Sequence, residues 1–83
     1  MDMEKMITAY PAMTDIHVTE GEPVSIRVYG SLKKLKEKGG DSFFTSLFHD
    51  FLGPEKEEEW TRRGSCDGGC TIGTSRIRIH MYH

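Results

Sequence analysis

Residues 75–82, Ser-Arg-Ile-Arg-Ile-His-Met-Tyr, alternate polar and apolar side chains without a break. Successive side chains of a β-strand point to opposite faces of a sheet, so this pattern predicts a strand with two different faces. The apolar face carries Ile77, Ile79 and Met81, and the polar face carries Arg76, Arg78, His80 and Tyr82. The segment therefore predicts a sheet that is buried on one side only.

Two earlier segments share this alternation, which predicts further strands of the same sheet. They are residues 15–18 (Asp-Ile-His-Val) and residues 24–29 (Val-Ser-Ile-Arg-Val-Tyr). A turn at residues 20–23 separates them, because glycine and proline interrupt the pattern there. Gly30-Ser31 is a candidate two-residue hairpin turn that leads into a short strand at residues 32–35.

The middle of the chain changes to a helical spacing. After a solvated loop at residues 36–40, Asp41 is the expected N-cap of a helix that ends at Gly53. Pro54–Arg63 is a second expected helix, because proline suits its first turn and glycine follows at Gly64. The first of these helices has an apolar stripe that consists of Phe43, Phe44, Leu47, Phe48, Phe51 and Leu52.

The ends of this pattern complete the expected fold. Residues 1–12 contain a leading helix that Pro11 terminates, and residues 65–74 form a glycine-rich loop with a short strand at residues 70–72. The order of elements predicts one α+β domain over residues 1–83, with an antiparallel β-sheet in residues 13–83 and helices packed on one face.

Length and charge exclude several classes of function. The chain has 83 residues and a net charge of −2, so we expect one small domain without the positive field that attracts nucleic acid. No apolar run reaches the length of a membrane span, and no export signal precedes the domain. With two cysteines, the chain is expected in the cytoplasm and without a disulfide scaffold.

The polar face of the predicted sheet is the first candidate site. It gathers Arg27, Arg76 and Arg78, and a guanidinium offers a planar fork of donors that suits phosphate or carboxylate groups. Asp15 and the histidines His17 and His80 share this face. The alternative is that these arginines keep an outer face hydrated or pair with acidic neighbours.

The cysteines and histidines form a second constellation. Cys66, Cys70, His80 and His83 could close a tetrahedral zinc site, with His17 in reserve, although their spacings do not match those of a zinc finger. The alternative is that the two cysteines are free thiols. No catalytic centre is evident, since the glycine-rich residues 64–74 lack the lysine of a phosphate loop and no base accompanies Ser65 or Cys66.

Residues 14–32 and 75–80 resemble parts of a known family. Thr-Asp-Ile-His-Val at 14–18, Gly21, Pro23 and Ser-Ile-Arg-Val-Tyr-Gly-Ser-Leu at 25–32 look like the opening of PilT/GspE-type ATPases of type IV pili and type II secretion. Ser-Arg-Ile-Arg-Ile-His at 75–80 is similar to the strand that closes the N-terminal domain in the pilus-retraction branch. The resemblance spans residues 13–82.

This resemblance implies a PAS-like N-terminal domain of a hexameric motor for secretion or twitching motility. Its expected partners are the RecA-like ATPase core of the same and neighbouring subunits, and platform proteins of the inner membrane. Arg27, Arg76 and Arg78 are expected near the nucleotide phosphates at the subunit boundary. The hexamer would bind ATP and Mg²⁺ at the cytoplasmic side of the membrane, without membrane insertion. The isolated chain, which lacks the ATPase core, is expected to hold no cofactor or metal and to be no enzyme.

The chain departs from the family pattern at three places. Tyr29 replaces the usual aspartate, His80 replaces the asparagine of the retraction branch, and residues 65–73 replace an acidic, aromatic strand. Two other interpretations stay open. One is a free-standing PAS-like module for ligand binding or dimerisation, and the other is a small interaction domain stabilised by zinc.

Overall fold

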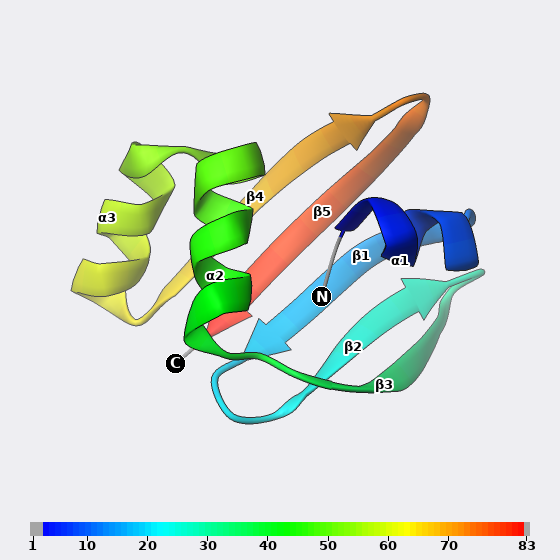
Figure 1. The fold of residues 1–83 in the computed structure, drawn as a ribbon, viewed down its shortest axis with the longest axis horizontal. Coiled ribbons are helices and arrows are strands. Elements are labelled where there is room, and N and C mark those ends of the chain that lie inside the picture. The colour runs from blue at the N-terminus through cyan, green and yellow to red at the C-terminus, as the bar shows by residue number, and fades with distance from the viewer. Residues whose placement is uncertain (1–2, 83) are drawn as a thin grey trace.

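The structure, a computed structural model, describes residues 3–82. In chain order the elements are α1 (Met3–Ala9), β1 (Met13–Thr19), β2 (Pro23–Val28), β3 (Ser31–Lys38), α2 (Asp41–Leu47), the π-helical turn η1 (Phe48–Leu52), α3 (Pro54–Arg63), β4 (Ser65–Ile72) and β5 (Ser75–Tyr82). The strands form one sheet in the order β3-β2-β1-β5-β4, and the helices lie on one face of it (Figure 1). The expected α+β architecture is therefore confirmed.

The centre of the sheet differs from the expectation. Strands β1–β2, β2–β3 and β4–β5 pair antiparallel, but β1 and β5 run parallel, with Asp15 opposite Arg78 and His17 opposite His80. The prediction of a wholly antiparallel sheet is wrong at this pair. The alternation of side chains could not reveal this, because it is the same in parallel and antiparallel ladders. The parallel arrangement is possible because the long connection from β1 to β5 contains helices that cross over the sheet.

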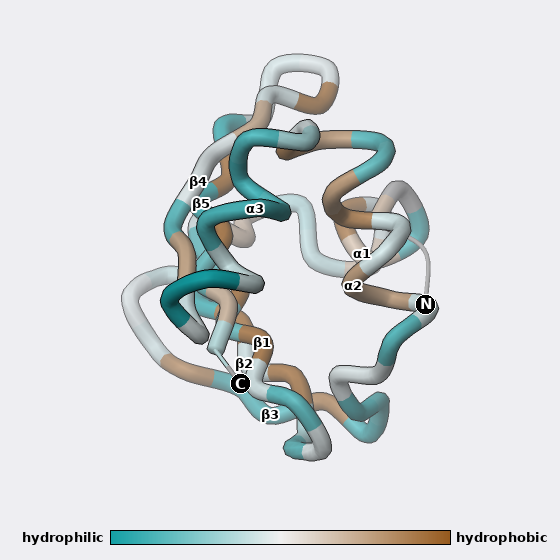
Figure 2. The backbone as a smooth tube through the Cα atoms, turned by 90° about the vertical axis from the view of Figure 1, so that its left-hand side faces the viewer, coloured by the Kyte–Doolittle hydropathy of each residue, from teal (hydrophilic) through white to brown (hydrophobic). Residues whose placement is uncertain are grey.

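The core lies between the sheet and α1 and α2, which form a second layer in the edge-on view (Figure 2). Its strand residues include those that the alternation assigned to the apolar face, namely Ile16, Val18, Val24, Ile26, Ile77, Ile79 and Met81, together with Met13, Cys66 and Cys70. The helical layer adds Phe43, Phe44, Leu47 and Phe48. Trp60 of α3 packs on this layer, with ring centroids 4.8 Å from Phe44 and 5.6 Å from Phe48.

Residues 36–38 and 65–69, which we expected to lie in loops, belong to strands, whereas the short strand expected at residues 70–72 is confirmed. Residues 36–38 continue β3, and β4 runs through Ser65–Ile72 in register with β5. The glycines at 68 and 69 carry no side chain that could reveal an alternation, so the pattern of β4 is hidden in the sequence. β4 forms because its backbone pairs with β5 along the whole length of Ser65–Ile72, and β5 has an unbroken strand pattern.

One turn and one helix N-cap lie one residue earlier than expected. The hairpin between β2 and β3 turns at Tyr29-Gly30, with φ of 52° and 79°, and not at Gly30-Ser31. A two-residue hairpin needs positive φ at both central residues when its turn is of type I′, and that places glycine second. Similarly, Gly40 and not Asp41 is the N-cap of α2, where Asp41 lies in the first turn.

The helix boundaries at Gly53, Pro54 and Gly64 are confirmed. Gly53 has a φ of 90°, Pro54 begins α3, and Gly64 ends it in the left-handed conformation with a φ of 80°. Within residues 3–82, none of the helices has the length and apolar character needed to cross a lipid bilayer.

Two adjacent glycines provide a test of how β3 closes onto β1. A Cβ atom at Gly39 would lie 2.8 Å from Val18 Cγ1 and 2.9 Å from the Thr19 carbonyl oxygen, whereas a Cβ at Gly40 meets nothing within 4 Å. We expect Gly39→Ser to lower the free energy of unfolding by about 1–3 kcal/mol, because it overpacks this contact. Gly40→Ser should leave stability unchanged or raise it by up to about 1 kcal/mol, because serine is a favoured N-cap. Urea denaturation measures both, and equal midpoints would contradict this packing.

Candidate functional site

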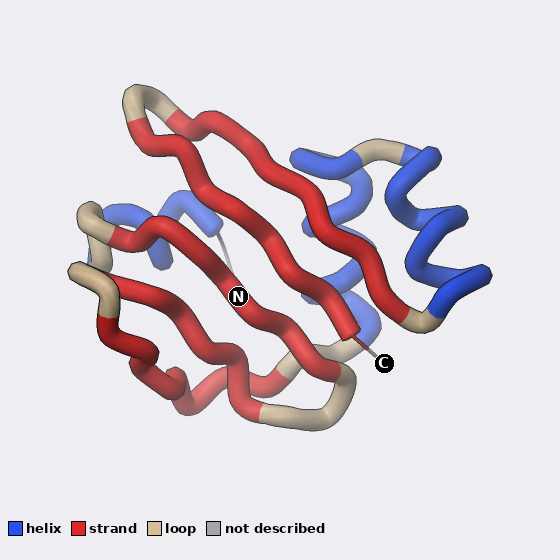
Figure 3. The backbone as a smooth tube through the Cα atoms, turned by 180° about the vertical axis from the view of Figure 1, so that it is seen from behind, coloured by secondary structure: helices blue, strands red, loops and turns tan. Residues whose placement is uncertain are grey.

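The sheet face opposite the helices carries most of the chemistry-bearing side chains and is called the polar face here. In Figure 3 this face is turned toward the viewer and the helices lie behind it. Three neighbouring strands, β2, β1 and β5, and the edge strand β4 contribute to it. Its members are Asp15, His17, Ser25, Arg27, Asp67, Arg76, Arg78 and His80.

Asp15 is the buried centre of the polar face, with 2% of its surface exposed. A register shift between Met13 and Asp15 bends the start of β1. Such a bulge interrupts the strict alternation, so that Met13 enters the core while Asp15, two residues later, faces the opposite side. The Asp15 carboxylate therefore has sheet neighbours around it and no helix above it.

Two donated hydrogen bonds, an ion pair and a histidine nitrogen surround the Asp15 carboxylate. Thr14 Oγ1 donates to Oδ2 at 2.8 Å, Arg78 Nη2 donates to Oδ2 at 3.4 Å, and Arg78 Nε lies 3.0 Å from Oδ1 in an ion pair. His80 Nε2 lies 3.1 Å from Oδ1. Burial by itself would raise the pKa of Asp15, but the hydrogen bonds from His80 and Thr14 and the charge of Arg78 outweigh it and leave the pKa below its usual value. Asp15 is therefore an anion.

His80 lies between two carboxylates. Its Nδ1 is 2.7 Å from Asp67 Oδ1, while its Nε2 is 3.1 Å from Asp15 Oδ1. A neutral imidazole has one N–H group and can satisfy only one of these acceptors. The second nitrogen therefore needs a further positive centre, which is either a second proton or a bound cation.

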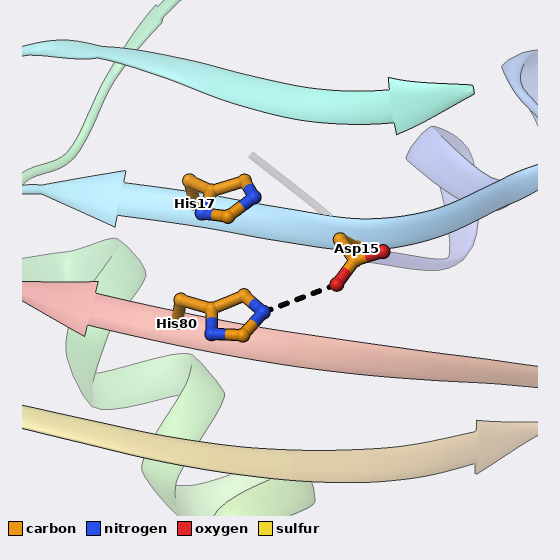
Figure 4. A group of neighbouring side chains, drawn as sticks. All are labelled: Asp15, His17 and His80. Atoms are coloured by element: carbon orange, nitrogen blue, oxygen red, sulfur yellow. Dashed lines mark hydrogen bonds and ion pairs between the residues drawn. The ribbon is translucent and has the colours of Figure 1, made fainter. Parts of the chain in front are cut away.

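His17 lies beside His80 on the neighbouring strand. Their ring centroids are 4.6 Å apart and the rings are inclined by 11°, so the imidazoles stack. Burial, followed by the proximity of His80, lowers the pKa of His17, although Asp15 opposes this. His17 Nε2 is buried and makes no hydrogen bond to any residue that the structure describes. Figure 4 shows both rings with a nitrogen turned toward the end where Asp15 lies.

The three predicted arginines share the polar face but differ in their partners. Arg78 is held by Asp15, as described above, although 68% of its side chain is exposed. Arg27 Nη1 donates to the Gly30 carbonyl at 2.8 Å, and Arg76 Nη1 donates to Thr71 Oγ1 at 3.3 Å. Among the described side chains, neither Arg27 nor Arg76 has a carboxylate in ion-pair contact, so both guanidiniums keep donors for an external anion.

The zinc site that the sequence suggested is wrong in its cysteines. Cys66 and Cys70 are buried free thiols on the core face of β4, and Cys66 Sγ lies 3.9 Å from the sulfur of Met81. His80 points to the opposite face of the sheet, because residues of one strand alternate and the pairs Cys66–Met81 and Asp67–His80 are adjacent. The two thiols and His80 therefore cannot bind one ion, and His83 lies outside the described residues.

Sequence reasoning did not identify Asp67 as part of the site. It lies in the segment that we expected to be a loop, where its position relative to β5 was undefined. A tight turn at Gly73-Thr74 could have revealed it. A hairpin that turns there pairs residue 72 with residue 75, and counting back along both strands places Asp67 opposite His80. Asp15 was assigned to the correct face, but its burial was not foreseen.

Comparison with known proteins adds no assignment. No protein-family model matches the chain, and no curated protein matches it.

The role of Asp15 leads to a prediction of stability. We expect Asp15→Asn to lower the free energy of unfolding by about 1–3 kcal/mol, because the amide loses the charge-assisted bonds and turns an NH₂ group toward donors. Asp50→Asn is the matched control, since Asp50 is exposed and should change stability by less than about 0.5 kcal/mol. Urea denaturation compares the two, and an unchanged midpoint for Asp15→Asn would refute a central structural role.

The buried thiols lead to a prediction of reactivity. Burial, with a smaller contribution from Glu59, raises the pKa of Cys66, and burial raises the pKa of Cys70 against the opposing charge of Arg76. Because the thiolate is the reactive form, we expect iodoacetamide to modify both cysteines at least about a hundredfold more slowly in native buffer than in urea. Mass spectrometry follows the reaction. Rapid alkylation of either cysteine in native buffer would contradict the position of β4.

Proposed function

We propose that this chain is the N-terminal regulatory and assembly domain of a hexameric motor ATPase of the PilT/GspE type, with a polar face that contacts nucleotide phosphates. The observation that carries the proposal is the uncovered sheet face with arginines on two different strands. A flat, rigid surface of this kind can be presented to a neighbouring subunit, and guanidinium forks suit phosphate oxygens.

The contacts of the arginines refine their proposed roles. Arg27 and Arg76 are the candidates for direct contact with phosphate, because hydroxyl and carbonyl oxygens are their protein partners. Arg78 is paired with Asp15 and would reach a phosphate group when that ion pair opens. Charge that develops on the transferred phosphoryl group is stabilised by such positioned donors, and this is the chemistry the domain would contribute.

The family resemblance supports the partners and location of the proposal. The domain would pack against the RecA-like core of its own and the neighbouring subunit, and the assembled motor would bind inner-membrane platform proteins of a pilus or secretion system from the cytoplasmic side. ATP and Mg²⁺ would be bound by that core. The departure at Tyr29 falls in the exposed hairpin turn and so lies away from the centre of the polar face.

The proposal predicts the sequence and the activity of the motor. Reading the encoding gene beyond codon 83 should reveal a phosphate loop followed by an acidic metal-binding strand. In the full-length hexamer, Arg27→Ala and Arg76→Ala should each lower kcat for ATP hydrolysis by roughly 10- to 100-fold, because each removes a donor from the growing charge. Phosphate release under saturating ATP measures this effect.

Arg62→Ala provides the matched control, since Arg62 is an exposed arginine of α3 that pairs with Glu58. It should leave kcat unchanged. A stop codon after residue 83 would overturn the motor proposal and favour a free-standing binding module. Full activity of both Arg27→Ala and Arg76→Ala hexamers would overturn the role of the polar face.

A further inference from the structure

We propose that Asp15, His17 and His80 form a binding site for a divalent cation of the zinc type on the polar face. One carboxylate oxygen and one nitrogen from each imidazole lie within 4.8 Å of one another. Imidazole nitrogen and carboxylate oxygen are both ligands of Zn²⁺. The site differs from the cysteine-containing one considered from the sequence, and it does not depend on the motor proposal.

The backbone of two neighbouring strands brings the three ligands together. Asp15 and His17 are two residues apart on β1 and face the same side, and His80 lies directly opposite His17 on β5. Figure 4 shows the result, with Asp15 at one end of two neighbouring imidazoles. Because all three belong to central strands, their Cα atoms are held by ladders on both sides.

The distances fit a cation with small adjustments. Two ligands at about 2.0–2.1 Å from a tetrahedral ion lie about 3.3 Å apart. His80 Nε2 and Asp15 Oδ1 are 3.1 Å apart, so they already have this separation. His17 must move closer, and its Nε2 has no hydrogen bond to lose.

The charges and hydrogen bonds also favour an ion. His80 Nδ1 is held by Asp67 at 2.7 Å, and a carboxylate on the far nitrogen is the usual support of a metal-bound histidine. In the metal-free chain Nε2 can carry the proton that bonds to Asp15; with the proton on Nδ1 instead, the Nε2 lone pair is available to a cation, which also neutralises the charge of the Asp15 oxygen. In the described part of the chain no helix lies over the polar face (Figure 3), and 22% of the His80 side chain is exposed, so a fourth ligand from solvent can approach on that side.

Arg78 is the opposing feature. Its Nε lies 3.0 Å from the same Asp15 oxygen in an ion pair, and its positive charge disfavours a second cation nearby. Because 68% of its side chain is exposed, the guanidinium can turn away when the ion enters. Competition of this kind predicts that removal of the arginine strengthens metal binding, an effect that partial unfolding cannot produce.

The experiment titrates Zn²⁺ into the untagged, chelator-treated 83-residue chain by calorimetry, with Co²⁺ absorption as a second measurement. We expect one ion per chain and a cobalt spectrum with nitrogen and oxygen ligands and no thiolate band. His17→Gln and His80→Gln should each weaken binding by at least about tenfold, and Asp67→Asn by roughly 10- to 100-fold. Circular dichroism verifies that each variant is folded.

Two further variants decide the result. Arg78→Gln should bind Zn²⁺ more tightly than the parent chain, whereas His49→Gln should bind it equally, because His49 lies on η1 and pairs with Asp50. No binding of Zn²⁺ by the parent chain would overturn the proposal. It would also be overturned by binding that persists in both His17→Gln and His80→Gln, or by a thiolate band in the cobalt spectrum.

Discussion

The buried carboxylate of Asp15 is the interaction on which the polar face depends. An anion withdrawn from water must be compensated by hydrogen bonds and opposite charge, and here the donors come from β1 and β5. These contacts tie the side chains of the parallel central pair together on the side that lacks a helical layer. Asp15 consequently orients the side chains of Arg78 and His80, although 68% of the Arg78 side chain is exposed to solvent.

The alternation of side chains was sufficient to predict which residues lie on which face. Ile77, Ile79 and Met81 are buried, while Arg78 and His80 are on the other side, as the period of two requires. The apolar stripe of α2 and η1 was predicted equally well from its helical spacing. These predictions succeeded because each depends on a local period that burial on one side imposes.

The prediction failed where the information is not local. The sequence of β1 does not specify whether β5 will lie parallel or antiparallel to it, because alternation is common to both ladders. The glycines of β4 conceal a strand. At position 68 packing explains the glycine, because a Cβ atom there would lie 2.5 Å from Leu52 Cδ2 and would displace that side chain. With β4 assigned to a loop, neither the inward position of Cys66 nor the contact of Asp67 with His80 could be derived.

Asp15 also connects the two functions proposed for this face. The carboxylate can bind the Arg78 guanidinium or a cation, but its Oδ1 atom cannot fully serve both. An ion held by Asp15 would release Arg78, which could then donate both of its bonds to an anion. Coupling of this kind is reciprocal, so a phosphate group that withdraws Arg78 would increase the affinity for the cation by the same factor. The buried carboxylate would thus make cation and phosphate binding cooperative, even though the two ligands contact different residues.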